Sequence, residues 1–247
     1  MKSLHVVFCI GLLLIAPWAA LAAEADFDKD KLDCFIEPYL VVNVGSEVPG
    51  VIETVNVDRG DFVKKGQVLA RLNSGVEQAT MENVRARLDF ATHEHERTSE
   101  LYKEGIMPFY DMDKAETNLL VVKSELKEAQ EVLERRTIRS PINGVVVERF
   151  LSAGERVEEK PILKLAQLDP LNVEVITPVT MLGSIKMGGR VEVRPEKPVG
   201  GVYIGRVKIV DRVIDAASGT FGIRIEISNT NYTLPAGLKC NVRFLRR

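Results

Sequence analysis

The chain has 247 residues, of which 45% are hydrophobic and 28% are charged, and its formal net charge is −2. A chain of this length can bury the cores of one to three small domains, while so many charged side chains keep its surface in water. The charge balance lacks the basic excess of nucleic-acid-binding domains, so we expect no nucleic-acid partner.

The N-terminus has the three parts of a secretory signal. Lys2 precedes an apolar run over residues 6–16, and Pro17 and a stretch of small residues follow that run. This pattern predicts a signal peptide at residues 1–23 and export from the cytoplasm. The alternative is an uncleaved membrane anchor, because residues 4–23 are nearly long enough to cross a bilayer.

Two segments rich in valine and glycine align with each other when their residue numbers are shifted by 94. Gly50 then matches Gly144, Gly60 matches Gly154, Val63 matches Val157, and Leu69 matches Leu163. Each segment alternates apolar residues at the period of a β-strand, which predicts two short β-meanders. A meander this small cannot bury both faces, so residues 47–73 and 138–168 should pair into one β-sandwich.

Glycines punctuate both meanders where tight turns need a positive φ. The glycines that we expect at such structural turns are Gly50, Gly60, Gly66, Gly144 and Gly154.

Residues 74–137, inserted between the two copies, have the pattern of two helices. Apolar and small side chains recur at spacings of three and four from Met81 to Tyr102 and again from Met112 to Leu133, as in two coiled-coil seams. Gly105 and Pro108 interrupt the pattern, because glycine suits a helix end and proline cannot continue the hydrogen-bond ladder. The sequence therefore predicts an antiparallel coiled-coil hairpin that projects about 45 Å.

Strand patterns resume after Asp169-Pro170 and predict a small β-barrel at residues 169–247, with a short helical stretch from Val179 to Lys186. Residues 24–46 should add a strand to the barrel or to its junction. The expected fold is therefore mainly β and elongated, with a split sandwich, a long α-helical hairpin and a β-barrel.

Two cysteines, Cys34 and Cys240, lie beyond the expected signal peptide, near opposite ends of the chain. An exported protein reaches a compartment that permits disulfides. Two alternatives stay open: a disulfide between them, or two buried free thiols.

These residues together resemble the periplasmic adaptor, or membrane fusion, proteins of the HlyD-like type. The resemblance runs from about Val44 to Val242. The family's split lipoyl-like domain is similar to Val48-Pro49-Gly50-Val51 and to the segment from Ile138 to Val145, and its barrel is similar to Leu168-Asp169-Pro170-Leu171 and Leu234-Pro235-Ala236-Gly237.

The resemblance implies a function and partners. It implies a non-catalytic, homo-oligomeric subunit in the periplasm that bridges an inner-membrane pump and a TolC-like outer-membrane channel. We expect a pump of the RND type in preference to one of the ABC type. Many relatives carry a further membrane-proximal domain after the barrel, whereas Arg247 closely follows the last expected barrel strand, so pump contact should fall to the barrel and the N-terminal segment.

The resemblance also assigns a partner contact to the hairpin tip. The family's tip often carries Arg-x-x-x-Leu-x6-Ser for docking on the channel, and Arg97 and Leu101 stand in the first two places here, with Pro108 in the place of the serine. This departure leaves the type of channel open. The candidate contact residues are Arg97, Leu101, Gly105, Ile106, Met107 and Pro108.

The alternative function is a biotin- or lipoate-type carrier subunit of a multienzyme complex, because lipoyl-like folds can present a modified lysine on a hairpin. Lys64-Lys65 lack the flanking methionine of a carrier site, so we expect no cofactor. His93 and His95 should point about 200° apart on a helix, which is wrong for a shared metal ion. Ser140 has no histidine near it in the sequence, and no phosphate-binding loop is present, so we expect no enzyme.

Overall fold

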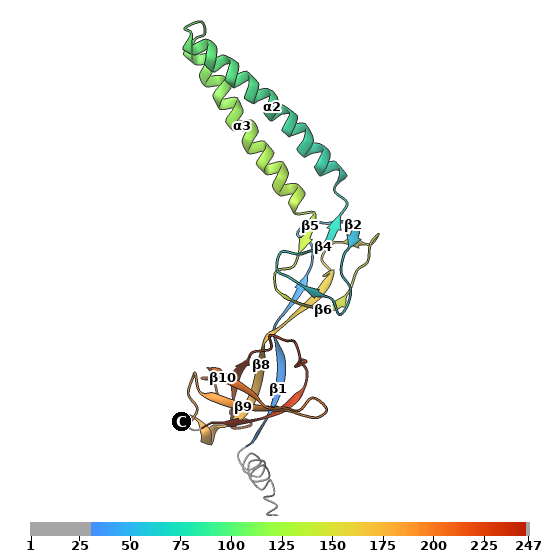
Figure 1. Cartoon of the computed structure of the whole chain (residues 1–247), viewed down its shortest axis with the longest axis vertical. Helices are drawn as coiled ribbons and strands as arrows, with labels where there is room; N and C mark the ends of the chain where they lie inside the picture. Colours follow the sequence, from blue (N-terminus) through green and yellow to red (C-terminus); the bar gives the residue numbers. More distant parts are fainter. Residues whose placement is uncertain (1–30, 246–247) are drawn as a thin grey trace, which may run out of the picture. The chain divides into compact units, whose positions relative to one another are not determined.

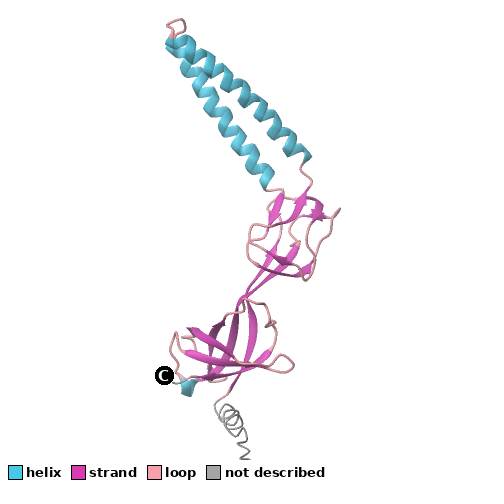
Figure 2. Cartoon of the chain, viewed as in Figure 1, coloured by secondary structure: helices cyan, strands magenta, loops and turns pink. Residues whose placement is uncertain are grey.

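The structure is a computed structural model that describes residues 31–245, so the expected signal peptide lies outside the described residues. The expected fold class is confirmed: the chain is mainly β, with a β-sandwich, a helical hairpin and a closed barrel (Figures 1 and 2). It divides into a sandwich unit, residues 38–171 and 229–233, and a barrel unit, residues 31–37, 172–228 and 234–245.

The two units share two long strands. Strand β1 (Leu32–Val44) and strand β8 (Leu163–Pro178) each contribute residues to both units. The sequence pattern placed a boundary at residue 169 because Asp169-Pro170 looked like a break, but β8 continues through that dipeptide. Likewise, β1 passes from the barrel unit to the sandwich unit at residues 37 and 38 and not at residue 46.

The β-sandwich is built from the two meanders found in the sequence. The first copy contains β2 (Gly50–Val55), β3 (Phe62–Val63) and β4 (Val68–Leu72), and the second contains β6 (Gly144–Arg149), β7 (Arg156–Val157) and the start of β8, with β5 (Thr137–Arg139) before it. The copies pair reciprocally, since Gly50 lies opposite Val157 and Gly144 lies opposite Val63. Gly50 and Gly144 are equivalent positions of the repeat, as are Val63 and Val157, so the two pairs are equivalent and the sandwich is pseudo-symmetric. Its most deeply buried side chains include Ile52, Leu69, Leu72, Ile162, Leu163 and Leu165.

Three of the five expected turn glycines do adopt a positive φ. These are Gly60 at 95°, Gly66 at 84° and Gly154 at 88°. The repeat extends to their hydrogen bonds, because the Gly60 N–H donates to the Val146 carbonyl and the Gly154 N–H donates to the Ile52 carbonyl, both at 2.8 Å.

For Gly50 and Gly144 the expectation of a turn is wrong, because each begins a strand and neither has a positive φ. Instead, the absence of a side chain at Gly50 and Gly144 lets neighbouring residues pack directly against their backbone. A Cβ on Gly144 would collide with the carbonyl oxygen of Ala166, and a Cβ on Gly50 would lie 2.8 Å from the Arg136 guanidinium and 3.1 Å from Leu72.

The helical hairpin consists of α2 (Gly75–Lys103) and α3 (Phe109–Glu134), which leave and re-enter the sandwich at neighbouring strands (Figure 1). The apolar positions predicted to face each other are buried or half-buried, with Ala91, Leu119 and Val122 at the centre. Tyr102 is the exception, being 40% exposed, because the seam ends before it and its ring turns to Phe109.

The barrel consists of β1, β8, β9 (Arg190–Pro195), β10 (Tyr203–Val210), β11 (Thr220–Ile227) and β12 (Lys239–Phe244), and it closes where β1 pairs with β8. Alternate residues of each strand fill its interior, among them Val173, Val193, Ile223, Ile225 and Val242. The helical stretch expected from Val179 to Lys186 is shorter in the structure, a single 3-10 turn at Val179–Met181 that Gly183, with φ 84°, follows closely.

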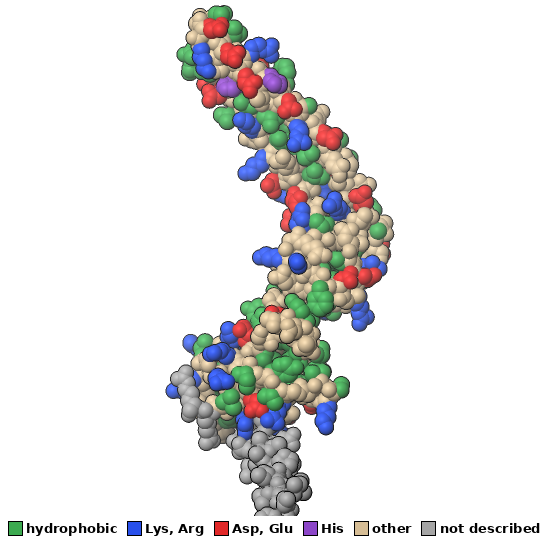
Figure 3. Space-filling view, in the orientation of Figure 1, with side chains coloured by type: hydrophobic (Ala, Val, Ile, Leu, Met, Phe, Trp, Pro, Cys, Tyr) green, Lys and Arg blue, Asp and Glu red, His purple; other side chains and the backbone are tan. Residues whose placement is uncertain are grey.

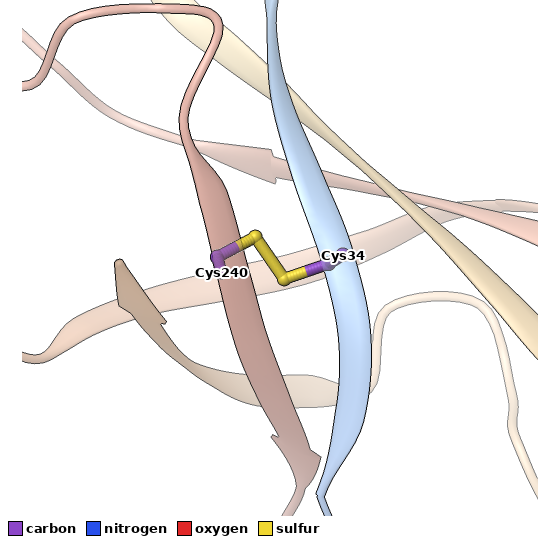
Figure 4. The surroundings of a disulfide bond; sticks show 2 residues. All are labelled: Cys34 and Cys240. Carbon is purple, nitrogen blue, oxygen red and sulfur yellow. A yellow bond between two sulfur atoms is a disulfide. The ribbon is translucent and has the colours of Figure 1, made fainter. Parts of the chain in front are cut away.

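Cys34 and Cys240 form a disulfide inside the barrel (Figure 4). They lie directly opposite each other on the antiparallel strands β1 and β12, with Cα atoms 4.8 Å apart. The bond therefore links the first strand of the barrel to the last, across 206 positions of sequence.

No helix within residues 31–245 combines the length and the apolar character that crossing a membrane requires.

Candidate functional site: the hairpin tip

The hairpin tip begins with a regular helix stop. After the C-cap residue Glu104, Gly105 takes a φ of 72°. The Gly105 N–H donates to the Tyr102 carbonyl at 3.0 Å, and the Ile106 N–H donates to the Leu101 carbonyl at 2.9 Å. These two bonds form a Schellman motif, which satisfies helix-end carbonyls and lets the chain reverse. The backbone of the tip is therefore held by hydrogen bonds.

The tip ends at Pro108, which is the N-cap residue of α3. Its φ of −64° and ψ of 148° keep the backbone extended until the helix begins, and its carbonyl accepts a hydrogen bond from the Asp111 N–H at 3.2 Å. The position where the family often has a docking serine is thus the N-cap itself. Serine could accept a backbone hydrogen bond there, whereas proline caps the helix without a side-chain bond.

Apolar side chains gather on the outside of this turn. Ile106 is 67% exposed and Tyr110 is 72% exposed, and Phe109 is exposed beside them. The Tyr102 and Phe109 rings meet edge to face, with centroids 5.9 Å apart and an interplanar angle of 62°. We call Tyr102, Ile106, Phe109 and Tyr110 the tip patch.

The sequence reasoning missed most of the tip patch. The candidate contact residues include only Ile106 of these four residues, because the seam spacing places Tyr102 between the helices and the motif does not reach Phe109 and Tyr110. A signal was present, because two adjacent aromatic residues directly after a proline stand out in a chain that is only 6% aromatic. Aromatic residues are enriched where proteins meet partners.

The remaining candidate residues are of two kinds: exposed residues that can contact a partner, and half-buried residues that stabilise the turn. Arg97 is exposed one helical turn before Leu101, on the same face of α2. Leu101 and Met107 are half-buried, and the Leu101 carbonyl accepts the N–H groups of both Ile106 and Met107, the latter at 3.3 Å. Leu101 and Met107 therefore support the turn, while Arg97 and Ile106 can reach a partner.

The hairpin's histidines do not converge on a common point. His93 Nδ1 lies 3.4 Å from Glu96 Oε2 on the exposed surface, and His95 is half-buried at a seam position. Within residues 31–245, no cluster of three or more His, Cys, Asp or Glu side chains has the arrangement of a metal site. Figure 3 shows mixed charges along the hairpin, with hydrophobic side chains at its end. The geometry thus suits a protein-contact surface.

Comparison with known proteins identifies the family. Residues 40–167 match the model of the CzcB-like barrel-sandwich hybrid domain, and residues 171–247 match that of the CusB-like β-barrel domain. The solved structure of a MacA–MexA chimeric protein containing the Pseudomonas aeruginosa MexA α-hairpin domain has a TM-score of 0.74, over 87% of this chain and 79% of that chain, at 23% identity. At this identity the likeness shows a shared fold.

Curated relatives are named as efflux components. The antibiotic efflux pump periplasmic linker protein ArpA of Pseudomonas putida is 25% identical over 221 residues, which cover 83% of this chain and 60% of that protein. The cobalt-zinc-cadmium resistance protein CzcB of Cupriavidus metallidurans is 24% identical over 253 residues, which cover 96% of this chain and 47% of that protein. This chain thus spans about half to three fifths of the length of these relatives. With one family model over more than half of its length and a second over most of the rest, the chain belongs to the periplasmic adaptor, or membrane fusion, protein family.

Proposed function

We propose that this chain is a non-catalytic periplasmic adaptor that connects an inner-membrane pump to an outer-membrane channel of the TolC type. The observation that carries the proposal is the tip patch, a set of exposed apolar side chains on a hydrogen-bonded turn at the end of a hairpin. Burying these side chains against a partner would remove apolar surface from water, which favours association. The relatives' names, which include periplasmic linkers of efflux pumps, support the same role.

The proposal includes an RND-type pump and a homo-oligomeric assembly. The barrel matches a model of the RND barrel group, which supports this type of pump. Exposed apolar side chains away from the tip, at Phe90 on α2 and at Leu120 and Val121 on α3, would be covered when hairpins of neighbouring copies pack side by side. Energy for transport would come from the pump.

The tip is tested by placing a charge in the patch. Ile106→Asp and Tyr110→Asp should each weaken channel binding by about 2 kcal/mol, or roughly 30-fold, because a carboxylate would be buried without a partner. Both side chains are exposed, so the thermal unfolding of the isolated protein should change little. Val76→Asp, at an equally exposed apolar position near the hairpin base, is the matched control.

The readouts are transport in cells and photocrosslinking from residue 106 to the channel. Transport that survives both tip substitutions, or that is lost equally in Val76→Asp, would refute the role of the tip. A crosslinker at Lys208 tests the pump contact separately, and the proposal requires adducts with the pump from the barrel.

A further inference from the structure

The six strands of the barrel divide its wall into two halves. In order around the wall the strands are β1, β12, β9, β10, β11 and β8, and β8 pairs with β1 to close the barrel. Strands β12, β9 and β10 are therefore neighbours on one half, and β11, β8 and β1 are neighbours on the other. Apolar side chains fill the interior, so the charged residues that alternate with them lie on the outer surface.

The first half of the wall is basic. Its strands carry six cationic side chains and a single acidic one, Glu192. Glu192 is already engaged, since its Oε1 lies 2.7 Å from Arg194 Nη2 and its Oε2 lies 3.2 Å from Arg243 Nη2. We call this half the basic face, and its cations are Arg190, Arg194, Arg206, Lys208, Lys239 and Arg243. Its net charge is strongly positive.

Two arginines of the basic face lie in an arrangement that does not stabilise the barrel. Arg190 of β9 is directly opposite Arg206 of β10, and both are exposed. Like charges directly opposite each other on neighbouring strands repel. Glu226 of β11 also lies opposite Arg206, but its carboxylate is 2.8 Å from Lys208 Nζ. Within the described part of the chain, Arg190, Arg206 and Lys239 form no ion pair, so these cations are available to a partner.

The second half of the wall is acidic. Within the barrel unit, its strands carry four acidic side chains and one cationic side chain, Arg224. Arg224 Nε donates a hydrogen bond to Glu174 Oε1, and Glu37 acts on Arg224 electrostatically. One guanidinium thus serves two carboxylates, which leaves an excess of negative charge. We call this half the acidic face, and its acids are Asp33, Glu37, Glu174 and Glu226.

The loops between the barrel strands do not alter this division. They carry three cations and three acids, so their formal charges cancel. These residues are Lys186, Lys197, Arg212, Glu196, Asp211 and Asp215. The contrast between the two faces therefore comes from the strands alone.

Each face also exposes an isoleucine among its charges. Ile204 of the basic face is 48% exposed and lies opposite Glu192. Ile176 of the acidic face is 64% exposed and lies two residues along β8 from Glu174. Apolar side chains surrounded by polar ones are typical of surfaces that bind other proteins. Both faces thus have the composition of a protein-contact surface.

We propose that the basic face of one copy binds the acidic face of a second copy, so that the barrels associate head to tail. One barrel carries both members of a complementary pair, so a second copy of this chain supplies the fitting surface. Because the two faces differ, each copy in such a pair keeps one face free, and further copies can join to form a ring. The inference rests on the homo-oligomeric part of the proposed function, and it adds a contact at the barrel to the one at the hairpins.

Photocrosslinking of the full chain in cells tests the contact. A photocrosslinking amino acid replaces Ile204 on the basic face, and the matched control carries it at Val213, an exposed apolar position in the loop after β10. We expect position 204 to give adducts with the mass of two copies, whose linked peptides come from β1, β8 or β11 of the second copy. Position 213 should give no adduct between copies.

Three results would overturn the proposal. The first is an equal yield of copy-to-copy adducts from positions 204 and 213, including none from either. The second is a set of linked peptides that come from β9, β10 or β12 of the second copy, because the contact would then join two basic faces. The third is a set of adducts from position 204 to another protein alone, which would assign the basic face to that protein.

Charge reversal tests the complementarity. Arg190→Glu with Arg206→Glu makes both faces negative, and Asp33→Lys with Glu37→Lys makes both positive. Each double variant alone should lower the adduct yield by at least about tenfold, because like charges then face each other across the contact. Co-expression of the two variants should restore the yield, since each again meets a face of opposite charge. An undiminished yield from either variant alone, or no recovery on co-expression, would overturn the proposal.

The charge-reversal test has two controls. Lys64→Glu with Lys65→Glu makes the same change of charge on an exposed turn of the sandwich and should leave the yield unchanged. A variant with a lowered thermal midpoint is set aside, and the salt dependence of the purified full chain with the crosslinker at position 204 then decides. Raising the salt from about 0.1 M to about 1 M shortens the Debye length from about 10 Å to about 3 Å, so the yield should fall. A yield that does not fall would overturn the proposal.

A crosslinker at Leu120 separates this inference from the proposed function. Leu120 is 58% exposed on α3, where the proposed function places the contact between hairpins. Copy-to-copy adducts from position 120 with none from position 204 would keep the homo-oligomer and overturn the barrel contact. Adducts from position 204, with no channel adduct from position 106 and no pump adduct from position 208, would support the barrel contact and refute the adaptor role.

Discussion

Arg136, which directly follows the hairpin, is paired with Glu77 in the first turn of α2, with Nη2 and Oε1 2.6 Å apart. The same guanidinium donates from Nη1 to the Pro49 carbonyl at 3.0 Å. The two side chains are only 22% and 15% exposed, so water screens the pair weakly. One arginine thus joins the base of both helices to the sandwich.

We expect Arg136→Ala to destabilise the protein by about 3 kcal/mol, because it leaves the Glu77 carboxylate and the Pro49 carbonyl without their charged donor. Urea unfolding of the single and double variants at Arg136 and Glu77 gives the coupling energy. Arg156→Ala is the control, since the Arg156–Glu158 pair is similarly short at 2.8 Å but well exposed, and its loss should cost less than about 1 kcal/mol. Equal costs at the two sites would show that burial does not strengthen the Arg136 pair.

Gly144→Ala tests the close approach of β6 and β8. The new Cβ would overlap the Ala166 carbonyl, and backbone cannot move away as a flexible side chain can, so we expect a loss of about 3 kcal/mol. Gly75→Ala, at the start of α2 with its nearest atom 3.9 Å away, should leave stability unchanged or raise it by up to about 1 kcal/mol. Thermal unfolding of both variants measures the contrast, and a tolerated Gly144→Ala would contradict the packing explanation.

Periodicity and the repeat predicted the parts of the fold that depend on local spacing. The repeat that matches Gly50 with Gly144 predicts that two meanders pair into a sandwich. The seam spacing predicts which side chains of α2 and α3 face each other, because burial follows the period of each element. The presence of a glycine predicts the local backbone conformation less well than periodicity predicts burial. The sequence does not distinguish a glycine in a turn from a glycine that lies close against the backbone of a neighbouring strand, so the role of Gly144 follows only from the position of Ala166 on β8.

At the hairpin tip, too, local sequence patterns predict the backbone but not the exposure of individual side chains. Gly105 and Pro108 predicted where the hairpin reverses, since helix ends have local sequence signals. Whether Leu101 or Phe109 faces solvent depends on how the reversal turns the chain, which no local pattern encodes. The sequence therefore predicts where along the chain the tip lies, but it does not predict which side chains of the tip patch are exposed.

The disulfide gives a prediction for the barrel. Replacing both Cys34 and Cys240 with alanine should lower the free energy of unfolding by about 2–5 kcal/mol, because the bond restricts a very long loop of the unfolded chain. Adding reductant should lower the thermal midpoint of the wild type and leave that of the double variant unchanged. Electrophoresis with and without reductant, with thiol titration, provides the check; equal mobility and two free thiols in the exported protein would contradict the bond.

Acidic pH should loosen the turn between β10 and β11 through Asp215. Its pKa lies below the ordinary value of 3.8, first because the Ala217 N–H donates to the carboxylate, and further because the Ser218 side chain and N–H donate to it. A carboxyl group whose pKa is lowered by folding stabilises the folded form above its unfolded pKa, and this contribution is lost as the pH falls through the folded pKa. The turn should therefore be tight at neutral pH and loosen below about pH 3.8.

Asp215→Asn should remove this dependence, because a neutral amide does not titrate. We expect the Ala217 amide to exchange hydrogen faster in the variant than in the wild type at pH 6, after correction for intrinsic rates, and the two to converge towards pH 3. Asp113→Asn, at an exposed position on α3, is the control and should follow the wild type throughout. If the difference in exchange rate between Asp215→Asn and the wild type instead grows as the pH falls, the predicted direction is wrong. That result would also contradict the hydrogen bond from the Ala217 N–H to an ionised Asp215 carboxylate.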